Sequence, residues 1–142
     1  MKKLLVFLCS AGLLSAQDPS PTAESVAARS HALELAGAFA NEGYKIRDGF
    51  WSGVVESGKP RFLQVNLFSG NEYWFSAATM APNAKLAVAL FDENGRLLEG
   101  EIFQDGDSAA AGIVAEASGK YFVRIELLGG DKADFCLVYS YK

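Results

Sequence analysis

From Tyr44 to the end of the chain, apolar and polar residues alternate with a period of two. Such alternation is typical of strands that bury one face. Turn-forming segments such as Ser57-Gly58-Lys59-Pro60 and Asp92-Glu93-Asn94-Gly95 separate the alternating runs. Roughly eight short strands at this spacing are the signature of an antiparallel sandwich or barrel. The pattern predicts one all-β domain over residues 44–142.

The alternation is clearest from Ser118 to Glu126, where a small-residue turn precedes a strand with Tyr121, Val123 and Ile125 on one face. The pair Asn94-Gly95 predicts a tight hairpin turn, because two-residue hairpins require positive φ values. A strand over Arg96 to Phe103 is expected to return from that turn.

Before Tyr44 the pattern is helical. Ser20-Pro21 reads as an N-cap followed by proline at the first helical position, and the composition favours helix from Thr22 to Ala40. Two apolar stripes lie on nearly opposite sides of this helix: Val26, Leu33 and Ala40 on one, and Ala28, Ala32, Leu35 and Phe39 on the other. One side can pack on the domain, and the other requires a loop, a second subunit or another protein.

The N-terminus has the features of a secretory signal peptide: Lys2 and Lys3, an apolar run, and the small residues Ser15-Ala16. The apolar run is about a dozen residues, well below the roughly 20 that a spanning helix needs. We expect cleavage after Ala16, a secreted or periplasmic protein, and no membrane insertion afterwards. The predicted organisation is a signal peptide at 1–16, a polar leader and helix at 17–43, and a β-sandwich at 44–142.

Charge and cysteine content restrict the partners. The formal net charge is −4, and loss of Lys2 and Lys3 with the signal peptide lowers it to about −6. An acidic chain without a basic cluster is repelled by nucleic acid and by anionic membranes, so we expect neither as a partner. Cys9 leaves with the signal peptide, so Cys136 has no intramolecular partner. Its position in an alternating strand predicts a buried thiol.

Three segments together resemble the bacterial pre-peptidase C-terminal domain. They are Gly70-Asn71-Glu72-Tyr73-Trp74-Phe75, the apolar strand from Leu86 that ends in Asp92-Glu93-Asn94-Gly95, and Ser118-Gly119-Lys120-Tyr121-Phe122-Val123-Arg124-Ile125. The resemblance covers about residues 50–141 and implies a jelly-roll-like β-sandwich with a non-catalytic role. Family members usually follow a protease in the same chain, whereas only a leader and a helix precede the domain in this sequence.

The sequence contains no recognisable catalytic device. His31 is the single histidine, and it lies in the helix, away from any Gly-x-Ser-x-Gly segment. A Ser-His-Asp or Cys-His arrangement would have to use it, and transition-metal sites generally need several His or Cys ligands. We therefore expect no enzyme and no cofactor; a hydrolase built on paired carboxylates is the remote alternative.

Two weaker binding signals remain. Asp92 and Asn94, and separately Asp105 and Asp107, offer oxygen ligands of the kind that calcium accepts, although turn formation explains these residues without an ion. Aromatic residues could form a flat stacking platform for sugars or peptides, with filling of the core as the alternative. The candidate platform residues are Trp51, Tyr73 and Trp74.

Taken together, the sequence favours a non-catalytic module that binds a protein or a cell-surface polysaccharide or peptide. The contact would be made by the N-terminal helix or by an exposed sheet edge. A structural, homo-oligomerising component of the cell envelope is the alternative.

Overall fold

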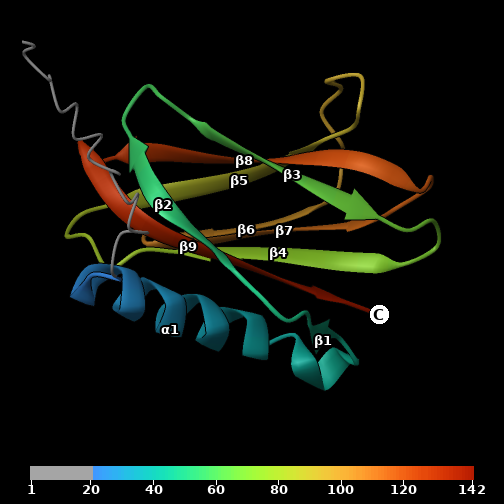
Figure 1. Ribbon diagram of the computed structural model, residues 1–142, viewed down its shortest axis with the longest axis horizontal. Coiled ribbons are helices and arrows are strands. Elements are labelled where there is room, and N and C mark those ends of the chain that lie inside the picture. Colours follow the sequence, from blue (N-terminus) through green and yellow to red (C-terminus); the bar gives the residue numbers. More distant parts are fainter. Residues whose placement is uncertain (1–20) are drawn as a thin grey trace, which may run out of the picture.

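The computed structural model describes residues 21–142, so the predicted signal peptide and most of the polar leader lie outside the described residues. The described chain folds into three layers, a helix and two antiparallel sheets (Figure 1). The helix is α1 (Ala23–Gly37), followed by the 3₁₀ turn η1 (Ala40–Glu42). The strands are β1 (Lys45–Ile46), β2 (Trp51–Glu56), β3 (Arg61–Leu67), β4 (Glu72–Ala78), β5 (Lys85–Phe91), β6 (Glu101–Asp105), β7 (Ser108–Val114), β8 (Gly119–Gly129) and β9 (Lys132–Tyr141).

The larger sheet has the order β1-β9-β4-β7-β6, and β2 pairs with β9 as well. The smaller sheet has the order β3-β8-β5. Every pairing between these strands is antiparallel. The prediction of an antiparallel β-sandwich with one N-terminal helix is confirmed.

Large apolar side chains from the two sheets meet in a single core. Phe75 and Phe135 of the larger sheet and Leu86 of the smaller one are each at most 1% exposed. The same cluster includes Val123 and Ile125 from the strand that the alternation marked most clearly. The period-two pattern thus identifies the residues that lie between the sheets.

The helix α1 covers the outer face of the larger sheet (Figure 1). Its three buried alanines, Ala28, Ala32 and Ala36, pack with Ala78, Cys136 and Val138. The opposite side of the helix stays open, with Val26 54% exposed. Of the two predicted stripes, the one that contains Ala28 and Ala32 therefore faces the domain.

The helix boundaries differ from the sequence expectation. The helix begins at Ala23, and Thr22 is its N-cap, because the Thr22 side chain accepts a hydrogen bond from the backbone N–H of Ser25 at 3.1 Å. Pro21 therefore precedes the cap and is not the first helical residue. Gly43 caps the following 3₁₀ turn, and its φ of 91° is one that glycine adopts readily.

The segment between β5 and β6 also differs. The expected two-residue hairpin at Asn94-Gly95 is a wider turn, in which Gly95 alone has a positive φ of 77°. The chain returns along β5 only briefly, with a backbone hydrogen bond from Leu98 N–H to the Leu90 carbonyl at 2.8 Å. It then crosses to the larger sheet, so the predicted strand 96–103 is replaced by β6 at Glu101–Asp105. Glycine at position 100 permits this close approach to β7, because a Cβ there would lie 2.2 Å from the Gly112 carbonyl oxygen.

Candidate functional site

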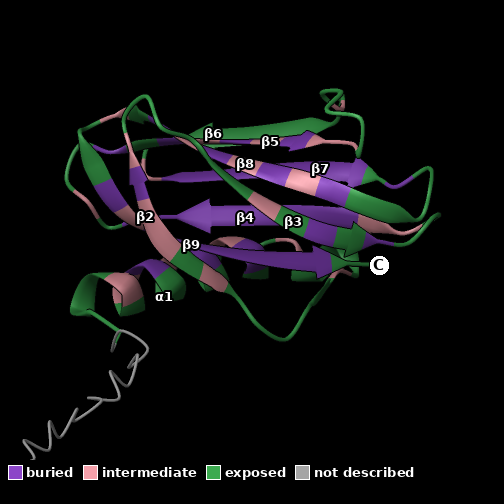
Figure 2. Ribbon diagram, turned by 45° about the horizontal axis from the view of Figure 1, so that its top comes forward, coloured by how far each residue is buried: buried purple, intermediate pink, exposed green. Residues whose placement is uncertain are grey.

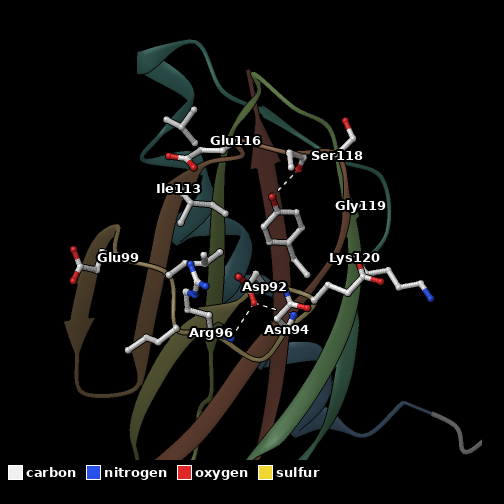
Figure 3. Close-up of a pocket in the computed structure, with 15 residues that line it drawn as sticks. Asp92, Asn94, Arg96, Glu99, Ile113, Glu116, Ser118, Gly119 and Lys120 are labelled. Carbon is white, nitrogen blue, oxygen red and sulfur yellow. Dashed lines mark hydrogen bonds between the residues drawn. The ribbon is translucent and has the colours of Figure 1, made fainter.

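A hollow of about 700 Å³ opens at one end of the sandwich. Two loops form its walls: residues 92–99 between β5 and β6, and residues 115–118 between β7 and β8 (Figure 3). The ends of β7 and β8 complete it with Ile113, Val114 and Tyr121. The segment from Ser118 to Tyr121, which begins the best-marked strand of the sequence, thus lies at this hollow.

The first wall is a compact turn held by one carboxylate. Asp92 Oδ1 accepts hydrogen bonds from the backbone N–H groups of Asn94 and Arg96, each at 2.9 Å. The Asp92 N–H donates to the Arg96 carbonyl at 3.0 Å. Figure 3 shows these contacts on the side of the hollow where Arg96 and Asn94 lie. The Asp92 carboxylate is therefore used to shape the turn.

The second wall is tied to the β3–β4 loop. The Ser69 N–H donates to Ser118 Oγ at 2.8 Å, and Ser69 Oγ donates to the Glu116 carbonyl at 3.0 Å. The Tyr121 hydroxyl donates to the Ala117 carbonyl at 2.6 Å. Both walls are therefore held by hydrogen bonds before any partner arrives, which lowers the entropy cost of binding.

The surface of the hollow combines apolar and charged side chains. Leu97 and Val114 are 57% and 59% exposed. The charged lining residues besides Asp92 are Glu93, Arg96, Glu99, Glu116 and Lys120. In the part of the chain that the structure describes, none of these five is in an ion pair. Apolar contacts inside a charged rim are the usual composition of a protein-binding surface.

A second hollow of about 410 Å³ continues around β7 from the first. Glu99, Ile113, Val114 and Glu116 line both hollows. Glu72 lies in the second hollow, where it accepts a hydrogen bond from the Tyr44 hydroxyl at 2.8 Å and has Lys142 Nζ at 3.3 Å. These contacts lower the pKa of Glu72, the Tyr44 hydrogen bond most of all.

The three aromatic candidates do not form one platform. Tyr73 is 3% exposed and lies in the core between the sheets. Trp51 is partly buried against the same core and stacks on Tyr139 with ring centroids 5.5 Å apart. Trp74 is on the opposite face of β4, where it stacks on Phe39 at 4.3 Å. The structure therefore supports the core-filling alternative for Tyr73 and Trp51, whereas Trp74 is covered on the outer face of the larger sheet.

The position of Trp74 depends on a glycine in the neighbouring strand. A Cβ at Gly112 would lie 2.7 Å from the Trp74 ring, so only glycine lets the ring lie flat over β7. Trp74 is enclosed between Gly112 and Phe39 and is 7% exposed. Little of this ring is left for a ligand.

The calcium candidates lie at opposite ends of the sandwich. Asp92 and Asn94 follow the end of β5, whereas the turn at Asp105–Asp107 meets its start, with Leu86 N–H bonded to the Gly106 carbonyl at 2.8 Å. Seven residues of strand, roughly 20 Å, separate the two turns. No group of three or more potential metal ligands occurs within residues 21–142. The structure therefore does not bring these calcium candidates together, and calcium binding stays the weaker alternative to turn formation.

His31 pairs with the other candidate aspartate. Its Nε2 lies 3.0 Å from Asp107 Oδ1, which ties α1 to the β6–β7 turn. This turn precedes β7, whereas the large hollow is at the far end of that strand. The hydroxyl of Ser118 is therefore remote from the only histidine, and the hollow contains no nucleophile–base pair.

Cys136 lies beneath α1 and is 0% exposed. Burial raises the pKa of its thiol, so the neutral form is favoured. The prediction of a buried, free cysteine is confirmed.

Together these features define a β-sandwich with one covering helix and a preformed hollow at one end. A solved structure with a similar fold is PliG of Aeromonas hydrophila, described as a periplasmic lysozyme inhibitor of g-type lysozyme. The TM-score is 0.51 at 17% sequence identity, covering 71% of this chain and 90% of that one. No protein-family model matches the chain, and no curated protein does so by sequence. The resemblance to pre-peptidase C-terminal domains stays a prediction.

The hollow was missed by sequence reasoning. The alternation predicts only the turn at Asp92-Glu93-Asn94-Gly95 and the small-residue turn at Ser118, and Leu97 falls in the strand expected over Arg96 to Phe103. One signal was present: Leu97-Leu98 interrupts the alternation and is followed at once by Glu99-Gly100.

No helix in the described chain is long and apolar enough to cross a membrane.

Proposed function

We propose that this protein is a non-catalytic module of the periplasm or secreted fraction that inhibits a lysozyme-type enzyme. The hollow at the loop end would contact the enzyme. The observation that carries the proposal is the exposure of Leu97 and Val114 at a hydrogen-bonded hollow. Its charged rim residues other than Asp92 form no ion pair with any residue in the range 21–142. The similar fold of a periplasmic lysozyme inhibitor supports a protein partner.

The charge of the chain favours a cationic partner. The formal net charge is −4, and acidic side chains outnumber basic ones around the hollow. Charge of opposite sign on the partner accelerates association and guides its orientation. The exposed apolar side chains would then supply most of the binding free energy, as central contacts do in protein interfaces.

The direct test measures lysis of bacterial cell walls by a g-type lysozyme with and without the purified protein. Addition of the protein should slow lysis, and the double variant Leu97→Asp/Val114→Asp should weaken inhibition by about tenfold or more. Leu128→Asp is the matched control, because Leu128 is 53% exposed near the other end of β8. Full inhibition by the double variant would show that the hollow is not the contact surface. If the protein slowed lysis by none of the g-type, c-type and i-type lysozymes, lysozyme inhibition itself would be contradicted.

One observation favours the structural, homo-oligomerising alternative. Val26 and Leu33 on the outward side of α1 are 54% and 36% exposed, and a second copy of the chain could cover them. Sedimentation of the protein at several concentrations distinguishes the two. A monomer throughout would leave the inhibitor proposal as the better account.

A further inference from the structure

Strand β6 is an open edge of the larger sheet. All five of its residues are exposed, and Figure 2 shows the strand as a continuous exposed ribbon. Among the described strands, it pairs with β7 alone. Outside that ladder, the β6 backbone makes a single hydrogen bond to any described residue, from Ser108 Oγ to the Asp105 carbonyl at 3.3 Å. Such an edge presents unpaired N–H and C=O groups to other chains.

Two other edges of the sandwich are protected. On β2, Arg61 Nη1 donates to the Val54 carbonyl at 2.8 Å and so covers outward backbone. On β5, the loop at Leu98 bonds to the Leu90 carbonyl, and the Leu86 N–H bonds to Gly106. Native proteins commonly protect edges in these ways. The open backbone of β6 therefore contrasts with the β2 and β5 edges.

The side chains of β6 give this edge a definite chemistry. Glu101, Phe103 and Asp105 pair with Gly112, Ala110 and Ser108 and share the outer face of the sheet. Phe103 is 38% exposed, and Ile102 on the other face is 59% exposed. The strand contains no lysine, arginine or proline. A strand added to this edge would lie beside an acidic, an aromatic and a second acidic side chain, in that order, on one face.

We propose that β6 is the docking edge for an extended segment of a partner protein. This segment has a cationic residue, an apolar residue and a second cationic residue at alternate positions, so that all three side chains lie on one face of the added strand. Main-chain hydrogen bonds would extend the sheet, and the alternate side chains would give specificity, as in other cases of strand addition. This site goes beyond the proposed function, because it uses a different surface from the loop-end hollow.

A second copy of the chain is a poor occupant of the same edge. Two β6 strands related by a twofold axis pair antiparallel, which places Glu101 of one copy opposite Asp105 of the other when Phe103 is at the centre. Like charges directly opposite each other are destabilising. A basic strand removes this repulsion and neutralises both carboxylates.

The test uses end-capped synthetic peptides and ¹⁵N-labelled protein. The matched peptide is Thr-Lys-Thr-Val-Thr-Lys-Thr, which reads the same in both directions and so fits either strand orientation. Its scrambled isomer, Thr-Lys-Lys-Val-Thr-Thr-Thr, has the same composition but places the lysines on opposite faces. The matched peptide should shift the amide signals of Ile102 and Gln104 and bind about fivefold more tightly than the isomer.

A charge-reversal variant tests the same idea from the protein side. Glu101→Lys should lose most of the preference for the matched peptide and gain affinity for a peptide with glutamates in place of its lysines. Glu24→Lys on α1 makes the same change in net charge away from β6 and should bind like the wild type. Retained dispersion of the β7 amide signals would show that the variant is folded.

Three outcomes overturn the proposal. One is equal binding of the matched and scrambled peptides. Another is a shift pattern confined to β3 or to the loop-end hollow. The third is a change of the β6 signals with protein concentration alone, which would identify a second copy as the occupant. Lysozyme inhibition is measured separately, so failure at β6 leaves the proposed function standing, and the reverse also holds.

Discussion

The layer between the two sheets and the layer beneath α1 are both buried, but they differ in the size of their side chains. Phe75 and Phe135 fill the first, whereas alanines of the helix meet Ala78, Cys136 and Val138 in the second. Because the hydrophobic contribution grows with the apolar area removed from water, the sandwich core holds most of the stability. The layer beneath the helix contributes less to the free energy of unfolding.

The helix layer also contains polar groups that weaken it. Ser76 lies opposite Val138 in the sheet, and Ser140 lies opposite Trp74, so both hydroxyls share the outer face. Neither Ser76 Oγ nor Ser140 Oγ has a hydrogen-bond partner among the described residues. A buried hydroxyl without a partner costs free energy. We therefore expect α1 to detach before the sandwich unfolds, and the loop-end hollow to survive that step.

The largest expected effect comes from opening the sandwich core. Phe75→Ala should lower the free energy of unfolding by about 3–5 kcal/mol, because it removes contacts and leaves a cavity. Phe68→Ala is the matched control, since Phe68 is 62% exposed, and it should change stability by less than about 0.5 kcal/mol. Urea unfolding followed by far-UV circular dichroism measures both. Equal losses would contradict the assignment of the core.

A smaller effect is expected from overfilling the helix layer. Ala32→Leu inserts a larger side chain at a residue that is 0% exposed and should cost about 1–3 kcal/mol. The neighbouring Leu33→Ala, at a residue 36% exposed, should cost less than about 0.5 kcal/mol. Hydrogen exchange should show faster opening of α1 in Ala32→Leu, with β8 still protected. Loss of protection in both elements at once would show that the two layers unfold together.

The sandwich was predictable because each strand buries one face and the sequence records that face locally. Tyr121, Val123 and Ile125 are all buried, as their alternation indicated. The same local logic placed Cys136 inside. It could not give the path after Gly95, because the position of Gly100 depends on the backbone of a strand that comes later in the chain.

The candidate site was beyond local patterns for a similar reason. The hollow exists because residues 92–99 leave β5 and cross to the larger sheet opposite the β7–β8 loop. Alternation also shows that Tyr73 and Trp74 face opposite ways, but not that Phe39 covers the outer face. Contacts of this kind join residues distant in sequence, and no spacing rule encodes them.

The smallest expected effect concerns the attachment of the segment that follows α1. Burial and the hydrogen bond to Glu72 raise the pKa of Tyr44 from 10.0 to about 12. The Lys142 ammonium lies 4.5 Å from the centre of the Tyr44 ring and donates to the Glu42 carbonyl at 3.2 Å. Tyr44, Glu72 and Lys142 thus form a small polar cluster that joins the end of the helix layer to the sheet.

A tyrosine whose folded-state pKa is raised contributes stability that is complete below the unfolded pKa and is lost as the pH rises through the folded value. Wild-type protein should therefore be slightly more stable than Tyr44→Phe near pH 9, and this difference should shrink as the pH rises to about 12. Thermal unfolding of both proteins at several pH values measures the difference. Tyr141→Phe, at a residue 37% exposed at the end of β9, is the control. A difference that stays constant over this range would show that folding does not raise the pKa of Tyr44.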